Sequence, residues 1–158
     1  MATHHLAQLN IARMRAPLDA PELADFVAGL PEINALADAA PGFVWRLQDE
    51  MGDATSVKAF GADMLVNLSV WESLAALHGF VFQTEHASFM RRRREWFERM
   101  MEPSLVLWWI PIGTEPSVDD AKRALQALRR QGATPAAFDF RSPFPPPGVP
   151  PAGVERSN

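Results

Sequence analysis

The chain has 158 residues, a net charge of −4 and 47% hydrophobic residues, which fits one globular domain with a sizeable core. It contains no cysteine and no tyrosine, so disulfides, thiol catalysis, cysteine-ligated metal and tyrosyl chemistry are excluded. The negative charge argues against nucleic acid as a partner, and no apolar run approaches the roughly 20 residues that span a bilayer.

Four segments carry polar residues at alternate positions, and each is predicted to be a strand because strand side chains alternate between the two faces of a sheet. Within each segment, one set of alternate residues (one parity) shares a face of the sheet and is almost wholly apolar. The other parity is mixed, and it faces solvent, a partner sheet or a ligand cavity. The predicted strands cover residues 5–11, 43–48, 64–71 and 104–111.

A helix is predicted between the first two strands. Asp19 is a capping residue at its start, Pro31 is expected to break or kink it, and Pro41-Gly42 ends it. The polar residues 49–63 are predicted to form a hairpin loop to the third strand.

After the third strand, short helical pieces are predicted, followed by a longer helix from about Thr84 to Met101 that Pro103 ends. A last helix follows the fourth strand, with a capping pattern at residues 117–120 and a stop at Gly132.

The order β-α-β-β-α-β predicts an α+β, ferredoxin-like domain over residues 1–141, with an antiparallel sheet and helices on one face. The C-terminal helix completes this domain. Residues 142–158 are rich in proline, and we expect a disordered or extended tail.

Helices on one face would leave the other face of the sheet bare. If the bare face is the mixed one, it exposes a larger apolar patch than a monomer usually shows, and a second copy is the simplest cover. We therefore expect a homodimer in which two sheets close into an α/β barrel. The exposed set would be Leu6, Val44, Leu65, Trp71, Val106, Trp108 and Ile110.

With this order and these motifs, the chain resembles a bacterial family known as domain of unknown function 3291. The resemblance covers roughly residues 4–145. It implies membership of the dimeric α/β-barrel superfamily, which is similar to the antibiotic-biosynthesis monooxygenases, but it carries no established reaction. The matching stretches are residues 5–10, 41–48, 66–73, 90–97 and 107–111.

Some members of that wider group degrade haem, with a histidine on the second long helix and an asparagine on the first strand. His86 and Asn10 are the positions here that match them loosely. The segment between Trp71 and His86 is shorter than the haem-degrading members suggest. We therefore predict no cofactor, and haem is the less favoured alternative.

His86 and Arg93 are the candidate catalytic residues. Arg93 lies four residues from Phe89 and from Phe97, so it falls on the apolar stripe of the predicted helix and points inward with His86. His86 is a candidate general base, with a structural histidine as the alternative.

A buried guanidinium needs a partner. For Arg93 this is a bound anion or a structural ion pair with Glu50, Glu72 or Asp139. The neighbouring arginines are expected to pair along the helix, as Arg91–Glu95 and Arg94–Glu98.

The mixed parity of the strands supplies candidate substrate-binding residues. Their amides, hydroxyl and guanidinium could orient a carbonyl, carboxylate or phenolate, or they could be consumed by hydrogen bonds across the strands and at the dimer interface. The rings of the two tryptophans could stack against one face of a flat ligand, or they could pack in the core. The set is Gln8, Asn10, Arg46, Asn67, Ser69, Trp71 and Trp108.

The sequence lacks nucleotide-binding, nucleophile-elbow and metalloprotease motifs, and no metal site is predicted. We expect a monooxygenase-like or isomerase-like enzyme acting on a small apolar or aromatic molecule. The alternative is a non-catalytic ligand-binding or dimeric scaffold protein. Because the first residues lack the features of a signal peptide, we expect a cytoplasmic protein.

Overall fold

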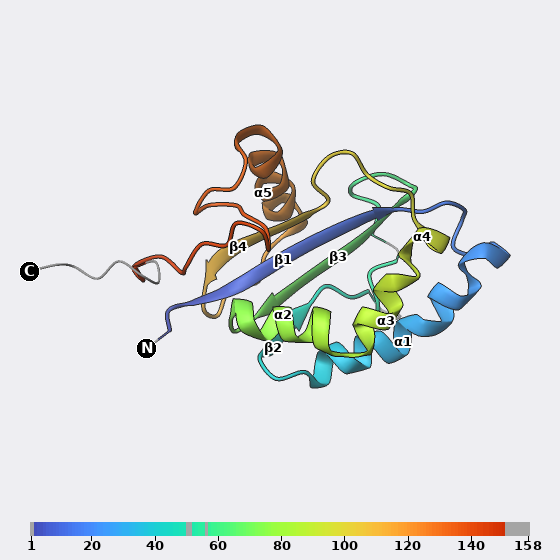
Figure 1. Ribbon diagram of the computed structural model, residues 1–158, viewed down its shortest axis with the longest axis horizontal. Helices are drawn as coiled ribbons and strands as arrows, with labels where there is room; N and C mark the ends of the chain where they lie inside the picture. Colours follow the sequence, from blue (N-terminus) through green and yellow to red (C-terminus); the bar gives the residue numbers. More distant parts are fainter. Residues whose placement is uncertain (1, 50–51, 56, 151–158) are drawn as a thin grey trace, which may run out of the picture.

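A computed structural model describes residues 2–49, 52–55 and 57–150 (Figure 1). Four strands form one antiparallel sheet in the order β2-β3-β1-β4, so the predicted strands and the β-α-β-β-α-β order are confirmed. The first strand runs two residues further than predicted and the second stops two residues earlier. The strands are β1 (His4–Arg13), β2 (Phe43–Arg46), β3 (Met64–Trp71) and β4 (Leu105–Pro111).

Three of the described helices begin after a residue whose side chain accepts a hydrogen bond from a free backbone N–H group. Ser73 accepts from Ala76 at the start of α2, and Ser117 forms a capping box with Asp120 at the start of α5. The described helices are η1 (Pro21–Leu23), α1 (Ala24–Ala39), α2 (Leu74–Gln83), α3 (Glu85–Arg91), α4 (Arg93–Trp96) and α5 (Val118–Gln131).

The first helical region starts differently from the prediction. Asp19 caps nothing, because η1 begins after Ala20 without a side-chain cap. Pro31 lies inside α1 and does not break it, since a proline on an exposed helix side removes only one backbone hydrogen bond.

The predicted helix from Thr84 to Met101 is wrong in its second half. The chain turns at Arg92 between α3 and α4, and it becomes extended at Phe97. There it pairs with the end of β1: Arg15 N–H donates to the Trp96 carbonyl, and Glu98 N–H donates to the Arg13 carbonyl, both at 2.9 Å. Pairing with β1 and burial of the Trp96 ring override the helical pattern.

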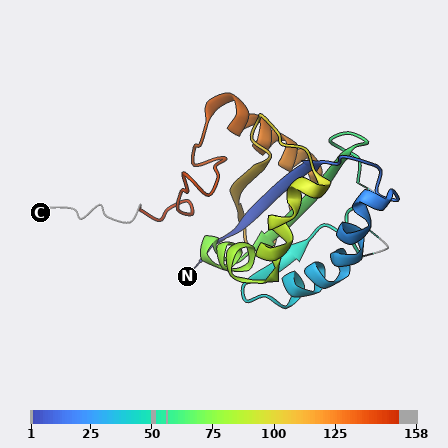
Figure 2. The ribbon, with the colours of Figure 1, turned by 45° about the vertical axis from the view of Figure 1, so that its right-hand side comes forward.

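Helices lie on both faces of the sheet, which corrects the prediction of one. Figures 1 and 2 place α5 on the side opposite α1, α2 and α3. The face under α5 holds the apolar parity of β1 and β3, together with Val106, Trp108 and Ile110. The register explains this, because Trp108 pairs with Ala7 and Val106 pairs with Leu9.

The large exposed patch behind the dimer prediction is therefore absent among the residues that the structure describes. Of its seven members, six are at most 9% exposed within the single chain, and Val44 is 40% exposed. The homodimer stays a prediction, without the support of that patch.

A bulge in β2 changes which face its side chains occupy. The register shifts between Phe43 and Trp45. Phe43 consequently packs on Trp71 with ring centroids 5.5 Å apart, whereas Trp45 packs on the opposite, apolar face. The common parity predicted for Phe43 and Trp45 is therefore wrong, because strand periodicity does not survive an extra residue.

Residues 142–150 contain no helix or strand, and the predicted tail beyond them lies outside the described residues. The chain just before this segment and its first residues pack against β4. Phe138 exchanges two backbone hydrogen bonds with Leu107, and the Trp109 indole donates to the Phe144 carbonyl at 2.9 Å. These contacts cover the outer edge of β4. Within the described part of the chain, no helix is long and apolar enough to cross a membrane.

Candidate functional site

A cavity of about 420 Å³ lies over one end of the mixed face of the sheet. Its walls come from α1 on one side and from α3 and α4 on the other. Most wall side chains are apolar or aromatic, as in pockets that bind small organic molecules. They include Phe26, Leu30, Ile33, Phe89, Met90 and Trp96.

The α1 wall follows from helical spacing. Phe26, Leu30 and Asn34 recur every four residues, so they lie on one side of α1 and all three line the cavity. The opposite wall approaches α1 very closely at Gly29, where a Cβ would lie 2.4 Å from the Phe89 ring. Gly29 therefore lets the Phe89 ring stack on Phe26, with centroids 5.6 Å apart.

Polar side chains of the central strands form the floor. Asn10 and Asn67 are directly opposite each other in the β1–β3 register, and both line the cavity. Asn67 is exposed although its strand has neighbours on both sides, because the cavity opens above it. The Gln8 amide donates to Asn67 Oδ1 at 3.0 Å, which leaves the Asn67 NH₂ group free to donate to a ligand.

A buried hydrogen-bond network continues from this floor along the sheet. Gln8 Nε2 also donates to Ser69 Oγ, and the Trp71 indole donates to the same oxygen, both at 2.9 Å. Gln8, Ser69 and Trp71 are at most 7% exposed, and none of them lines the cavity. The Gln8 NH₂ group, the Ser69 oxygen and the Trp71 indole N–H are engaged inside the protein, so these residues position Asn67 rather than line the cavity.

Arg46 lines the cavity but is largely occupied. Its Nε and Nη2 donate to the two carboxylate oxygens of Asp38, at 2.7 and 3.3 Å. Its Nη1 donates to the Gly52 carbonyl at 2.6 Å. Arg46 therefore ties the β2–β3 loop to α1, and three of its five N–H groups are engaged in that contact.

His86 stands at the start of α3, where Thr84 caps the helix by accepting from the His86 N–H at 3.2 Å. Its ring lines the cavity and lies 5.0 Å from the Phe80 ring. Burial lowers the pKa of His86 below its ordinary value, and the Val81 carbonyl opposes this by accepting from Nδ1 at 3.4 Å. The imidazole is therefore neutral at pH 7, and its Nε2 carries the lone pair.

Three arginines line the cavity near its opening: Arg93, Arg94 and Arg99. All three are exposed, so the expected burial of Arg93 is wrong. Partial desolvation, together with the nearby charges of Arg93, Arg99 and Arg15, lowers the pKa of Arg94. None of the three forms an ion pair with a described carboxylate.

The ion pairs expected along the helix differ from those observed. Arg92 donates to Asp25 and to Glu95, both at 2.7 Å, and these bonds raise the pKa of Arg92. The expected Arg91–Glu95 and Arg94–Glu98 pairs do not form, because the turn at Arg92 ends the regular spacing of the helix. Of the three partners expected for Arg93, neither Glu72 nor Asp139 pairs with it, and Glu50 lies outside the described residues.

The structure thus divides the nine predicted site residues into three groups. Trp108 lies on the opposite face of the sheet, which corrects its assignment beside Trp71. Gln8, Ser69 and Trp71 form the buried hydrogen-bond network described above. The five that the fold brings to one cavity are Asn10, Arg46, Asn67, His86 and Arg93.

Sequence reasoning missed several cavity residues. Asn34 had a usable signal, because a polar residue stands where the stripe from Phe26 and Leu30 predicts an apolar one. Arg94 and Arg99 had none, because their positions depend on the turn at Arg92. Among the described residues, no group of three His, Cys, Asp or Glu side chains could hold a metal ion.

Comparison with known proteins places the chain in a family without assigning a reaction. No curated protein matches it. Among solved structures, a protein of unknown function from Nitrosomonas europaea is 16% identical with a TM-score of 0.45, over 73% of this chain and 95% of that one. A Pseudomonas aeruginosa protein is 17% identical with a TM-score of 0.47, over 72% and 98%. The model of a domain of unknown function, DUF3291, matches residues 5–153, and the chain belongs to that family.

Proposed function

We propose that this protein binds a small, largely apolar or aromatic molecule in the cavity and acts on it by proton transfer. The observation that carries the proposal is the convergence of Asn10, Asn67 and His86, which come from distant parts of the sequence, on one apolar-walled cavity. Apolar and aromatic wall side chains combined with convergent polar groups are typical of binding sites for small organic molecules.

In this proposal, His86 is the general base. A neutral imidazole with a free Nε2 lone pair can remove a proton from an acidic C–H or O–H group of the substrate. The Asn67 NH₂ group would donate to the oxygen on which the resulting negative charge develops. Returning the proton to another carbon would complete an isomerase-like reaction, whereas electron donation from the anion to dioxygen would begin a monooxygenase-like one.

Arg93 takes a different role from the one expected of a buried catalytic residue. Its guanidinium is exposed at the rim of the cavity, so we assign it to substrate binding rather than to the chemical step.

The alternative function is binding without chemistry. It is favoured by the surroundings of His86, whose Nδ1 contacts only a backbone carbonyl among the described residues, whereas a catalytic imidazole is often oriented by a carboxylate. In that case the cavity would hold its ligand unchanged, as in a carrier or sensor. The predicted homodimer and cytoplasmic location are compatible with both functions.

Native mass spectrometry of freshly purified protein, with its visible absorption spectrum, tests the binding claim first. We expect an additional small-molecule mass, and the spectrum tests haem through its Soret band. Leu30→Trp fills the cavity and should abolish the additional mass. Val27→Trp is the matched control, because Val27 lies on the same helix, is 40% exposed and does not line the cavity.

The catalytic claim is tested with the molecule identified in this way. We expect the wild-type protein to convert it, and His86→Gln to bind it with similar affinity but to lose turnover by about 10²-fold or more. Equal turnover by His86→Gln would eliminate His86 as the base. If the wild-type protein binds the molecule but does not convert it, the catalytic claim is wrong and only the binding function remains.

A further inference from the structure

We propose that the bound molecule is an organic anion, an apolar acid whose charged group is held by Arg93, Arg94 and Arg99 while its body lies over the sheet, against the apolar side chains of α1 and α3. This inference rests on the proposed function and adds the chemical class of the ligand. Its basis is the charge balance and the construction of the cavity mouth.

The charge of the cavity is opposite to the charge of the whole chain. The chain carries a net charge of −4, yet the charged side chains lining the cavity are four arginines and two carboxylates, Asp53 and Glu98, among the described residues. Arg46 is compensated by Asp38. Asp53 accepts from the Thr55 backbone and hydroxyl rather than from an arginine.

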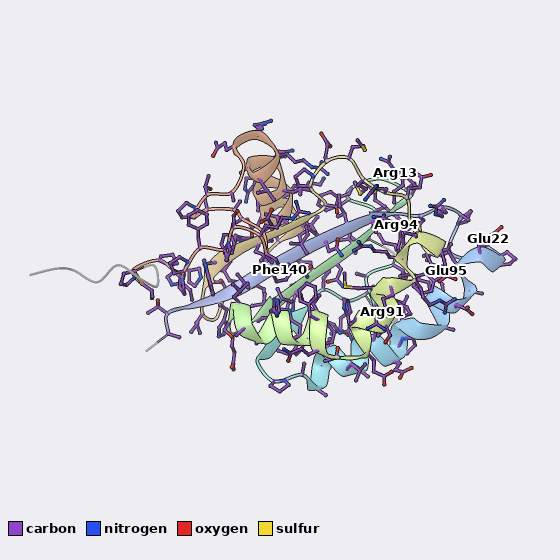
Figure 3. The ribbon with its side chains drawn as sticks, in the orientation of Figure 1. Arg13, Glu22, Arg91, Arg94, Glu95 and Phe140 are labelled. Carbon is purple, nitrogen blue, oxygen red and sulfur yellow. The ribbon has the colours of Figure 1, made fainter. Side chains whose placement is uncertain are left out.

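The three remaining arginines are held in place by the fold. Arg93 and Arg94 stand in α4, which is anchored by Trp96, a side chain only 2% exposed. Arg99 follows the segment in which Phe97 pairs with Met14 beside β1. In Figure 3, Arg94 lies near the end of β1 that carries Arg13, whereas Arg91, on α3, lies farther from that end.

Two arginines near these three show what a structural role looks like. Arg92 forms two ion pairs and lies over the Trp96 ring, so its charge stabilises the turn. Arg15 donates to the Phe97 carbonyl. Arg93, Arg94 and Arg99 have no such bonds among the described residues, although all three line the same cavity. Desolvation and the charges of Arg93, Arg99 and Arg15 lower the pKa of Arg94.

Gathering like charges beside an apolar cavity costs free energy, and an anion bound between them offsets that cost. Guanidinium groups match the planar fork of a carboxylate. The Asn67 NH₂ group adds a neutral donor on the floor, and the neutral His86 adds no competing charge. The walls of Phe26, Leu30 and Phe89 suit an aromatic or alicyclic body.

The test compares 1-naphthoate with the neutral 1-naphthalenemethanol by isothermal titration calorimetry. Both share one apolar body, so the ratio of their affinities isolates the charged group. We expect the wild type to bind the acid at least tenfold more tightly. Replacing Arg93, Arg94 and Arg99 together by glutamine should remove that preference and leave the affinity for the alcohol unchanged.

Arg91→Gln and Arg130→Gln are the matched controls, because each removes one exposed arginine charge that does not line the cavity. Both should keep the preference for the acid. Equal binding of the acid and the alcohol by the wild type, with both abolished by Leu30→Trp, would overturn the anion preference and leave the proposed function intact. Binding of neither compound at millimolar concentration would count against both.

Discussion

Gly29→Ala tests whether α1 and α3 pack as closely as the cavity wall requires. Alanine in a helix interior is more favourable than glycine by about 1 kcal/mol, so the change should stabilise the protein if the new methyl group has room. At Gly29 a Cβ would lie 2.4 Å from Phe89 Cε2 and 2.9 Å from Cζ. Phe89 cannot simply swing away, since its ring also packs on Phe26 and on Trp96, with centroids 5.6 and 4.8 Å away.

Forcing a methyl group into a filled site costs roughly 1–3 kcal/mol. Set against the helix-propensity gain, Gly29→Ala should leave the free energy of unfolding unchanged or lower it by up to about 2 kcal/mol. Gly79→Ala is the matched control, because Gly79 lies inside α2 and a Cβ there would meet only the Gln83 side chain, at 3.8 Å. That variant should raise the free energy of unfolding by about 0.5–1 kcal/mol.

The assay is urea denaturation followed by far-ultraviolet circular dichroism, on wild type and both variants. A Phe89→Ala background completes a double-mutant cycle. With the ring removed, Gly29→Ala should become stabilising by about the same amount as Gly79→Ala. Equal stabilisation by both glycine replacements in the wild-type background would refute the close contact between α1 and α3.

Three further predictions follow from named contacts. Gln8→Leu should lower the free energy of unfolding by about 1–2 kcal/mol in the same assay, because it removes a buried amide from its hydrogen bonds and frees the Asn67 side chain. Ser117→Ala should cost about 1 kcal/mol through loss of the capping box of α5, measured by the same urea transition. The stability of the wild type should fall as the pH is lowered through 6.5, because the folded state lowers the pKa of His86 and the unfolded chain binds the proton more readily. His86→Gln should flatten that dependence over this pH range.

The predictable part of the fold was the part determined by local pattern. Alternation located all four strands, and the capping pattern at residues 117–120 located the start of α5. What alternation could not supply was the pairing register and the bulge in β2. Those two features decide that Trp108 faces α5 and that Phe43 leaves the face occupied by Trp45. Both depend on contacts between distant segments, which no short window of sequence contains.

The site was predictable to the extent that it lies on strands and at the start of a helix. Asn10, Asn67 and His86 were found because a polar residue on an otherwise apolar element needs an explanation. The arginines were harder, because their prediction assumed a continuous helix. Once the chain turns at Arg92, a residue expected on the buried stripe moves to the rim of the cavity, and Arg94 joins it there.

The mixed face of the sheet is buried at one end of its strands and open to the cavity at the other end. Where α2 covers it, the Trp71 ring stacks on Phe80 with centroids 5.1 Å apart, and the Gln8 amide donates to Ser69 Oγ. Farther along, the cavity separates the sheet from α1 and from the α3–α4 segment, and the same kind of polar side chain, Asn67, is left open. Burial of unsatisfied amides would be costly, so the closed end must pair its polar groups internally. The open end is free of that requirement, and it is there that polar strand residues remain available to a ligand.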